Sequence, residues 1–324
     1  ATALPLLVLL LLATACAPLP TVTLLPTAAP LAEAQSTAPS ATPAATSAPT
    51  AEPQPTPTSE PLAALVNGQP LPLAVYEEAL SQYAADLQAR GIDPNSPEGQ
   101  AEMSRAGEWI LNVLIEQILT EQAAAAAGVV VSEAEVDAYM EMLVNENNGQ
   151  EAFLAKLAER GETYESARRE VRAGLIGMAM TDRITAGVPQ TAEHVHARHI
   201  LVDTPEKAQN ILAQLRSGAD FVALAQAYSL DASTKDTGGD LGFFPRGILL
   251  APEVEEAAFA LQPGQFSDVI TSSLGYHIVQ VIERDPARQV SPENLRLLQD
   301  RAVQEWVEGL WAAAQIERFV GTTP

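Results

Sequence analysis

Two histidines in apolar stretches constrain the fold of this chain more than any other feature. His199 lies in the segment HARHILV, and His277 lies in LGYHIVQV, nearly eighty residues later. Apolar residues alternate in both segments, which is typical of strands with one buried face. Burying an imidazole among apolar side chains costs free energy unless the ring is hydrogen-bonded. We therefore expect the two strands to bring the two rings together.

The residues around these histidines predict a small domain of mixed α and β structure. Strand patterns and helix patterns follow one another, and a polar loop rich in Ser, Thr, Asp and Gly separates the two halves. The elements expected between residues 190 and 285 are strand 195–202, helices 205–216 and 220–228, loop 229–240, strand 241–244, helix 253–260, and strands 267–273 and 277–283.

Four motifs in this region resemble those of the parvulin-type (PpiC-like) peptidyl-prolyl cis-trans isomerases. They are HARHILV, the loop GGDLG, the helical segment AAFAL and GYHIVQV, and they follow in the same order over some ninety residues. The resemblance implies an α+β fold, in which helices surround a small, mostly antiparallel four-stranded sheet. It also implies isomerisation of X-Pro peptide bonds.

The resemblance implies three polar residues at the catalytic centre. His199 and His277 match the paired histidines of parvulins, and Asp231 matches a position that holds aspartate or cysteine. In this interpretation the rings hydrogen-bond one another, and Asp231 orients an imidazole or acts on the substrate carbonyl. The alternative is that the two imidazoles only satisfy each other within the fold and take no part in turnover.

The resemblance also implies an apolar pocket for the substrate proline. Leu241 matches one pocket residue, and the family's methionine and phenylalanine fall near Leu250 and Val254. Because the chain has one residue more than usual here, Leu249 is the alternative to Leu250. Rotation about a peptide bond faces a barrier of about 18–20 kcal/mol that arises from amide resonance. A dry apolar pocket favours the twisted amide, so the reaction needs neither a nucleophile nor a cofactor.

A histidine cluster in the first strand raises the question of a metal site. Imidazoles are common zinc ligands, and the strand carries His194, His196 and His199. Side chains alternate across a strand, so His194 and His196 share a face while His199 points to the other. With no thiolate or obvious fourth ligand nearby, we expect no metal.

The first sixty residues differ from the rest of the chain in composition. The apolar run Leu4–Leu12 and the small residues after it precede Cys16, the single cysteine, and resemble a bacterial lipobox. We expect residues 1–16 to be a lipoprotein signal peptide with Cys16 as the lipidation site; the alternative is a fragment of a transmembrane or buried segment. Residues 17–61, almost entirely Pro, Thr, Ala and Ser, are expected to be a disordered tether.

Between the tether and the isomerase-like region the pattern is helical. Asn67-Gly68 predicts a tight hairpin turn, and Gly187-Val188-Pro189 marks a domain boundary. Helices are expected at 73–90, 98–127, 132–147, 149–160 and 163–185. In the second helix, a stripe predicts a core face made of Trp109, Ile110, Val113, Leu114 and Ile118.

This helical region resembles the chaperone domain of exported foldases of the SurA and PrsA type. A last helix begins at Ser291 and Pro292 and needs an apolar partner, so we expect it to pack back on the helical domain. The predicted organisation is a signal peptide (1–16), a tether (17–61), an all-α chaperone domain (62–189), a parvulin domain (190–285) and a C-terminal helix (286–324).

The formal net charge of −23 limits the partners of the chain. Such a surface repels phosphate backbones, so we expect no nucleic-acid binding. The leading hypothesis is a foldase, lipid-anchored outside the bacterial cytoplasmic membrane, that acts on unfolded or nascent exported polypeptides with X-Pro bonds. The alternatives are a non-enzymatic holdase with a degenerate parvulin domain for peptide docking, and a stalked adhesion protein.

Overall fold

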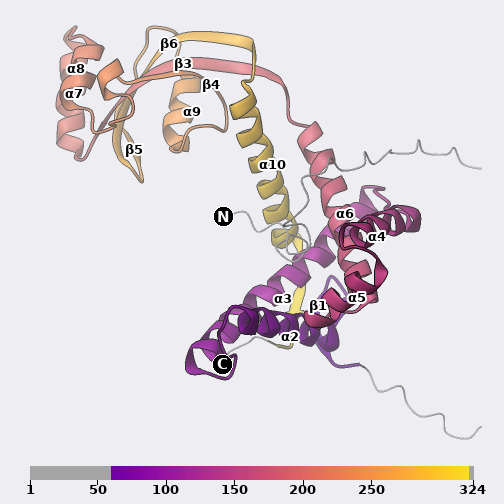
Figure 1. The fold of residues 1–324 in the computed structure, drawn as a ribbon. Coiled ribbons are helices and arrows are strands. Elements are labelled where there is room, and N and C mark those ends of the chain that lie inside the picture. The colour runs from indigo at the N-terminus through magenta and orange to yellow at the C-terminus, as the bar shows by residue number, and fades with distance from the viewer. Residues whose placement is uncertain (1–59, 321–324) are drawn as a thin grey trace, which may run out of the picture. The chain divides into compact units, whose positions relative to one another are not determined.

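The computed structural model describes residues 60–320, which form two compact units (Figure 1). The first comprises residues 60–179 and 314–320, and the second comprises Met180–Ala313. The expected signal peptide with Cys16 lies outside the described residues, and so does the expected tether up to residue 59. Within residues 60–320, no helix has both the length and the hydropathy needed to span a bilayer.

The first unit contains a small antiparallel sheet with the strand order β2-β1-β7. Strands β1 (Leu62–Val66) and β2 (Gln69–Pro72) form a hairpin, in which Asn67 and Gly68 both have positive φ angles of 50° and 82°. Two consecutive positive φ angles are what a type I′ turn requires, so the hairpin predicted from Asn-Gly is confirmed. Strand β7 (Ile316–Arg318) pairs with the other edge of β1.

Five helices follow the hairpin and confirm the helical pattern of the sequence. Helix α4 begins with a capping box, in which Ser132 and Glu135 each bind the other's backbone N–H. Phe153 and Leu157 from α5 pack with buried residues of α4 and α6 to form one core cluster of this unit. The helices are α2 (Leu73–Ala89), α3 (Pro97–Ala126), α4 (Glu133–Glu146), α5 (Gln150–Glu159) and α6 (Tyr164–Ala186).

The second unit is built on a four-stranded antiparallel sheet with the order β4-β3-β6-β5. The fold class implied by the resemblance, α+β with a small antiparallel sheet among helices, is therefore confirmed. The two central strands are longer than expected and pair over most of their length. The strands are β3 (Thr191–Val202), β4 (Asp240–Pro245), β5 (Ile270–Ser272) and β6 (Gly275–Gln289).

Helices cover the two faces of this sheet and create two apolar clusters. On one face, α7 (Pro205–Arg216) and α8 (Phe221–Tyr228) pack against Ile200, Val202 and Ile278. On the other, α9 (Pro252–Ala260) packs against β3 and β6. The second cluster, which we call the α9 cluster, contains the buried residues Val195, Ala197, Phe244, Ala251, Val254, Ala258, Phe259, Val279 and Val281.

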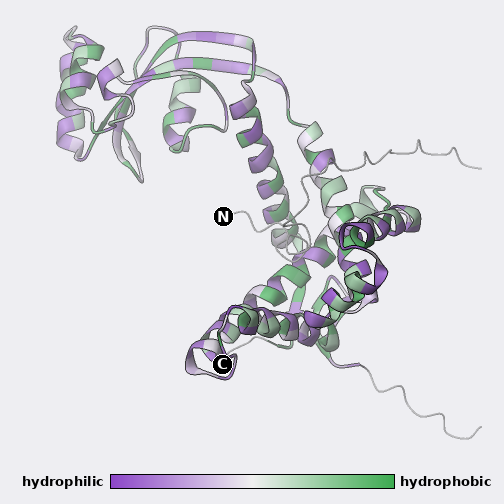
Figure 2. Cartoon of the chain, viewed as in Figure 1, coloured by the Kyte–Doolittle hydropathy of each residue, from purple (hydrophilic) through white to green (hydrophobic). Residues whose placement is uncertain are grey.

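Helix α10 (Pro292–Ala313) starts at the residues that the sequence indicated. The Ser291 side chain accepts a hydrogen bond from the backbone N–H of Asn294 at 3.2 Å, as an N-cap does. Hydrophobic and hydrophilic residues alternate along the helix (Figure 2). The segment that returns to the first unit is strand β7, and the packing of α10 on the N-terminal helices stays a prediction.

Candidate functional site

The two histidines singled out in the sequence lie side by side on the sheet. His199 is on β3 and His277 on the adjacent β6, where His277 is paired with Leu201, two residues from His199. Their rings are stacked, with centroids 5.6 Å apart and an interplanar angle of 21°. The two Nδ1 atoms are 3.4 Å apart. Both side chains are buried, so each ring depends on polar partners within the protein.

Asp231 lies at the outer side of this pair. Its Oδ2 atom is 2.7 Å from Nε2 of His199 and accepts a hydrogen bond from the Thr234 hydroxyl at 2.6 Å. Its Oδ1 atom accepts hydrogen bonds from the backbone N–H and the hydroxyl of Ser233. Burial alone would raise the pKa of Asp231, but the bonds from Ser233, Thr234 and His199 together outweigh it and lower that pKa. Asp231 is therefore a carboxylate at neutral pH.

Ser272 lies at the other side of the pair, next to His277. Its hydroxyl is 2.8 Å from Nε2 of His277 and accepts a hydrogen bond from the backbone N–H of Leu274. Burial, and after it the positive charge that His199 can carry, lower the pKa of His277 to about 4. His277 is therefore neutral at pH 7, with one ring nitrogen that donates and one that accepts.

One set of proton positions satisfies every contact in this line. The Ser272 hydroxyl donates to Nε2 of His277, and Nδ1–H of His277 donates to Nδ1 of His199. Nε2–H of His199 then donates to the Asp231 carboxylate. The result is a continuous hydrogen-bonded line, Ser272–His277–His199–Asp231, that ends on a fixed negative charge. Sequence reasoning missed Ser272 and Thr234, because single hydroxyl residues in turns carry no periodic signal.

A glycine allows the chain to close tightly over His199. Gly239 accepts a hydrogen bond from the His199 backbone N–H at 2.8 Å and has a φ of 84°. A Cβ atom at this position would lie 2.0 Å from the carbonyl oxygen of His199. Only glycine fits here, which explains the GGDLG motif physically.

The expected pocket residue Leu241 lies at an irregularity in β4. Ala197 of β3 pairs with Gly242 and the next residue with Asp240, so Leu241 is the extra residue of a β-bulge. Gly242 has a φ of 67°, which bulges of this kind use. The bulge turns the half-buried Leu241 against the α9 cluster.

The other three expected pocket residues differ in how deeply they are buried. Val254 is buried within the α9 cluster, and the half-buried Leu249 packs against it. Leu250 is 90% exposed and lies outside the cluster. Leu249 therefore packs against the α9 cluster, whereas Leu250 points to solvent, and the choice between them as a pocket residue stays a prediction.

The α9 cluster adjoins the histidines on the same face of the sheet. His199 pairs with Val279 of the cluster, and His277 pairs with Ile270, which packs against it. Side chains two apart on a strand share a face, so His277 points to the same side as Val279. The site thus combines a polar line with an adjoining apolar cluster.

The remaining histidines of the first strand have partners of their own. Nδ1 of His194 is 2.9 Å from the carbonyl oxygen of Ala192, and Nε2 of His196 is 2.8 Å from the Asp240 carboxylate. His194, His196 and His199 thus have three different partners. No group of three His, Cys, Asp or Glu side chains within residues 60–320 could hold a metal ion.

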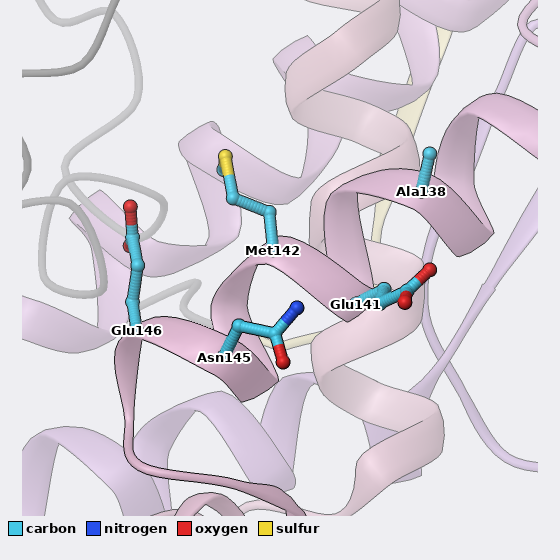
Figure 3. Close-up of a pocket in the computed structure, with 5 residues that line it drawn as sticks. All are labelled: Ala138, Glu141, Met142, Asn145 and Glu146. Atoms are coloured by element: carbon cyan, nitrogen blue, oxygen red, sulfur yellow. The ribbon is translucent and has the colours of Figure 1, made fainter.

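A shallow hollow in the first unit lies over α4 (Figure 3). It is lined by Ala138, Glu141, Met142, Asn145 and Glu146. These side chains include no imidazole or hydroxyl, and the hydrogen-bonded line lies in the second unit.

Two protein families match separate parts of the chain. Residues 196–283 match the PPIC-type PPIase domain, known as Rotamase. Residues 55–156 match the SurA-like N-terminal domain. The first match contains the whole polar line, and the second covers most of the helices of the first unit.

Two relatives and a solved structure are similar to a large part of this chain. The foldase protein PrsA of Caldanaerobacter subterraneus is 29% identical, over 80% of this chain and 87% of its own length. The PrsA protein of Halalkalibacterium halodurans is 31% identical, over 65% of this chain and 69% of its own length. A crystal structure of peptidylprolyl isomerase PrsA from Bacillus anthracis is 26% identical, covers 63% of this chain and 94% of that chain, and has a TM-score of 0.42. By its identity to these relatives over most of their length, the chain belongs to the PrsA family of foldases.

Proposed function

We propose that this protein is a foldase that isomerises X-Pro bonds in exported polypeptides at the site of His199, Asp231 and His277. The observation that supports it most is the hydrogen-bonded line beside the α9 cluster, within the region that matches a peptidyl-prolyl isomerase domain. The non-enzymatic holdase is not favoured, because both this match and the PrsA relatives point to an isomerase.

The chemistry required is stabilisation of a twisted amide. Rotation removes the resonance of the X-Pro bond, so the nitrogen loses its partial positive charge and the bond becomes less polar. The half-buried Leu241 and Leu249 provide apolar surface for the pyrrolidine ring, and the buried Val254 belongs to the cluster against which they pack. The Asp231 charge and the neutral His277 act through fixed hydrogen bonds, and no side chain needs to take a proton from the substrate.

The Asp231→Asn variant tests this proposal together with the wild-type protein. The full chain should accelerate cis/trans exchange of a proline peptide. Asp231→Asn should lower kcat/KM about tenfold, because the variant loses part of a charge-assisted hydrogen bond worth roughly 1.5–3 kcal/mol. Exposed Asp236 follows on the same loop, so Asp236→Asn removes an equal charge as the control. A folded wild-type protein with no activity above background would refute the enzymatic function.

We propose that the helical region binds unfolded clients. We also propose the predicted division into a chaperone domain (62–189), a parvulin domain (190–285) and a C-terminal helix (286–324). The match of residues 55–156 with a SurA-like N-terminal domain supports a chaperone role. Membership of the PrsA family supports a place outside the cytoplasmic membrane.

We also propose that Cys16 carries a lipid anchor and that residues 17–61 are a tether. The support is the apolar run before Cys16 and the Pro-rich composition after it. In a bacterial host, the wild-type protein should fractionate with membranes and Cys16→Ser should be released, since attachment depends on acyl chains at this residue. Equal fractionation of the two proteins would contradict the anchor.

A further inference from the structure

The loop between β4 and α9 is held by one carboxylate. Glu255, in the first turn of α9, accepts hydrogen bonds from three consecutive backbone N–H groups of this loop. Its Oε1 accepts from Gly247 at 2.8 Å, and its Oε2 accepts from Ile248 at 2.9 Å and Leu249 at 3.1 Å. Nothing in the sequence motifs assigned a role to this residue.

The three bonds decide the path of the loop. Residues 246–251 lie outside β4 and α9, so their N–H groups have no ladder partner and need another acceptor. Bonds to an ionised acceptor are about twice as strong as neutral ones. Held in this way, the loop directs Leu249 against the α9 cluster and Leu250 into solvent.

Helix α10 confines the same loop from another side. Gly247 has a φ of 90°, and a Cβ atom there would lie 2.8 Å from Cδ2 of Leu298 and 3.2 Å from Nη1 of Arg301. The loop is therefore set between the Glu255 carboxylate and α10. This leaves the carboxylate as the polar group that decides where the Leu249 side chain lies.

We propose that Glu255 is a positioning residue of the isomerase, which holds the 246–251 loop so that Leu249 closes the proline pocket. Glu255 acts through the loop backbone and does not itself touch the substrate. The inference rests on the proposed function, since it assigns the residue that shapes the same site.

The first test compares Glu255→Gln with Glu256→Gln in the full chain. Glutamine keeps one acceptor oxygen but turns an NH₂ group toward the backbone donors, so kcat/KM for a proline peptide should fall about tenfold. Glu256 is the next residue of α9 and is exposed, so Glu256→Gln removes the same charge and should keep wild-type activity. Thermal unfolding checks that both variants fold.

A double-mutant cycle distinguishes positioning from a general loss of stability. If Glu255 acts through Leu249, Glu255→Gln should change kcat/KM by less than twofold in a Leu249→Ala background, because residues that act on one contact are not additive. In an Asp231→Asn background it should keep its full tenfold effect. Additive effects in the Leu249→Ala background would overturn the inference.

The remaining outcomes are also decisive. If the wild-type protein is inactive, the proposed function fails; if it is active and Glu255→Gln matches Glu256→Gln, only the positioning role fails. Should Glu255→Gln not fold, Glu255→Asp replaces it, because aspartate keeps the charge in the first turn of α9 but withdraws the carboxylate by one methylene. The same loss and the same coupling to Leu249→Ala are then expected, and their absence overturns the role.

Discussion

The Gly239→Ala variant is expected to lose about 3–5 kcal/mol of stability in the second unit. This loss combines the strain of a left-handed backbone conformation with the cost of overpacking. Gly239 has a φ of 84°, and its Cβ would lie 2.0 Å from the His199 carbonyl oxygen and 3.2 Å from the His199 nitrogen. The obstructing atoms are backbone atoms of a central strand, so they cannot rotate away as a side chain would. Relief requires β3 and the GGDLG loop to separate.

Gly218→Ala is the matched control for this prediction. Gly218 follows α7 in the same unit with a φ of 92°, yet nothing lies within 4 Å of the position of its Cβ. This variant therefore has the strain of a left-handed backbone without a steric clash, and it should lose only about 1–2 kcal/mol of stability. Hydrogen exchange of the β3 and β6 amides measures the opening of this unit separately from the other. Equal losses in the two variants would contradict the collision at His199.

Separation of β3 from the loop also has a functional consequence. The backbone N–H of His199 is bonded to Gly239, and the loop that follows Asp231 leads into this glycine. A displaced loop carries Asp231 away from Nε2 of His199, now at 2.7 Å. Stability and isomerase activity should therefore fall together in Gly239→Ala.

The sequence predicts those parts of the fold and of the site that follow a periodic pattern or belong to a motif. Alternation of apolar residues placed His199 and His277 on buried strand faces, and the order of four motifs implied the antiparallel sheet that the structure contains. The Asn-Gly turn and the capping box of α4 were predictable because each depends on a few adjacent residues.

Residues that act across a turn or a loop were not predictable in this way. Ser272 reaches His277 only because β5 and β6 form a hairpin, and Thr234 reaches Asp231 through the turn that joins them. The sequence pattern places Glu255 in a helix, but it does not indicate that its carboxylate reaches back to Leu249. Each of these contacts joins residues three to six positions apart through an irregular turn or loop, for which a single sequence has no periodic signal.

The predicted core stripe of α3 was half wrong for a related reason. Ile110 and Ile118 are buried as expected, but the other three members of the stripe are only half-buried. Leu111, Ile115 and Leu119 are buried instead. The helix is apolar over more than one stripe, so periodicity alone does not decide which side faces the core. Strand β7, at three residues, was too short for any pattern to indicate.

Acid should destabilise the second unit through His277, between about pH 6.5 and pH 4. Burial, followed by the positive charge that His199 can carry, lowers the pKa of His277 from its ordinary 6.5 to about 4 in the folded protein. Below pH 6.5 the unfolded chain binds a proton that the folded chain does not, so stability falls as the pH falls through this window. One pH unit of difference is about 1.4 kcal/mol, so the full loss is about 3 kcal/mol.

His277→Asn should remove this pH dependence, whatever its effect on stability at neutral pH. The comparison uses the change in opening free energy between pH 7 and pH 4.5, from exchange of the β3 and β6 amides corrected for the intrinsic rate at each pH. Asp231 affects a different window, because its pKa is lowered and its contribution is lost only below about pH 4, the ordinary range of an aspartate. Asp231→Asn should therefore leave the loss between pH 6.5 and 4.5 intact. An equal loss in wild type and His277→Asn would show that His277 is not held neutral by its burial beside His199.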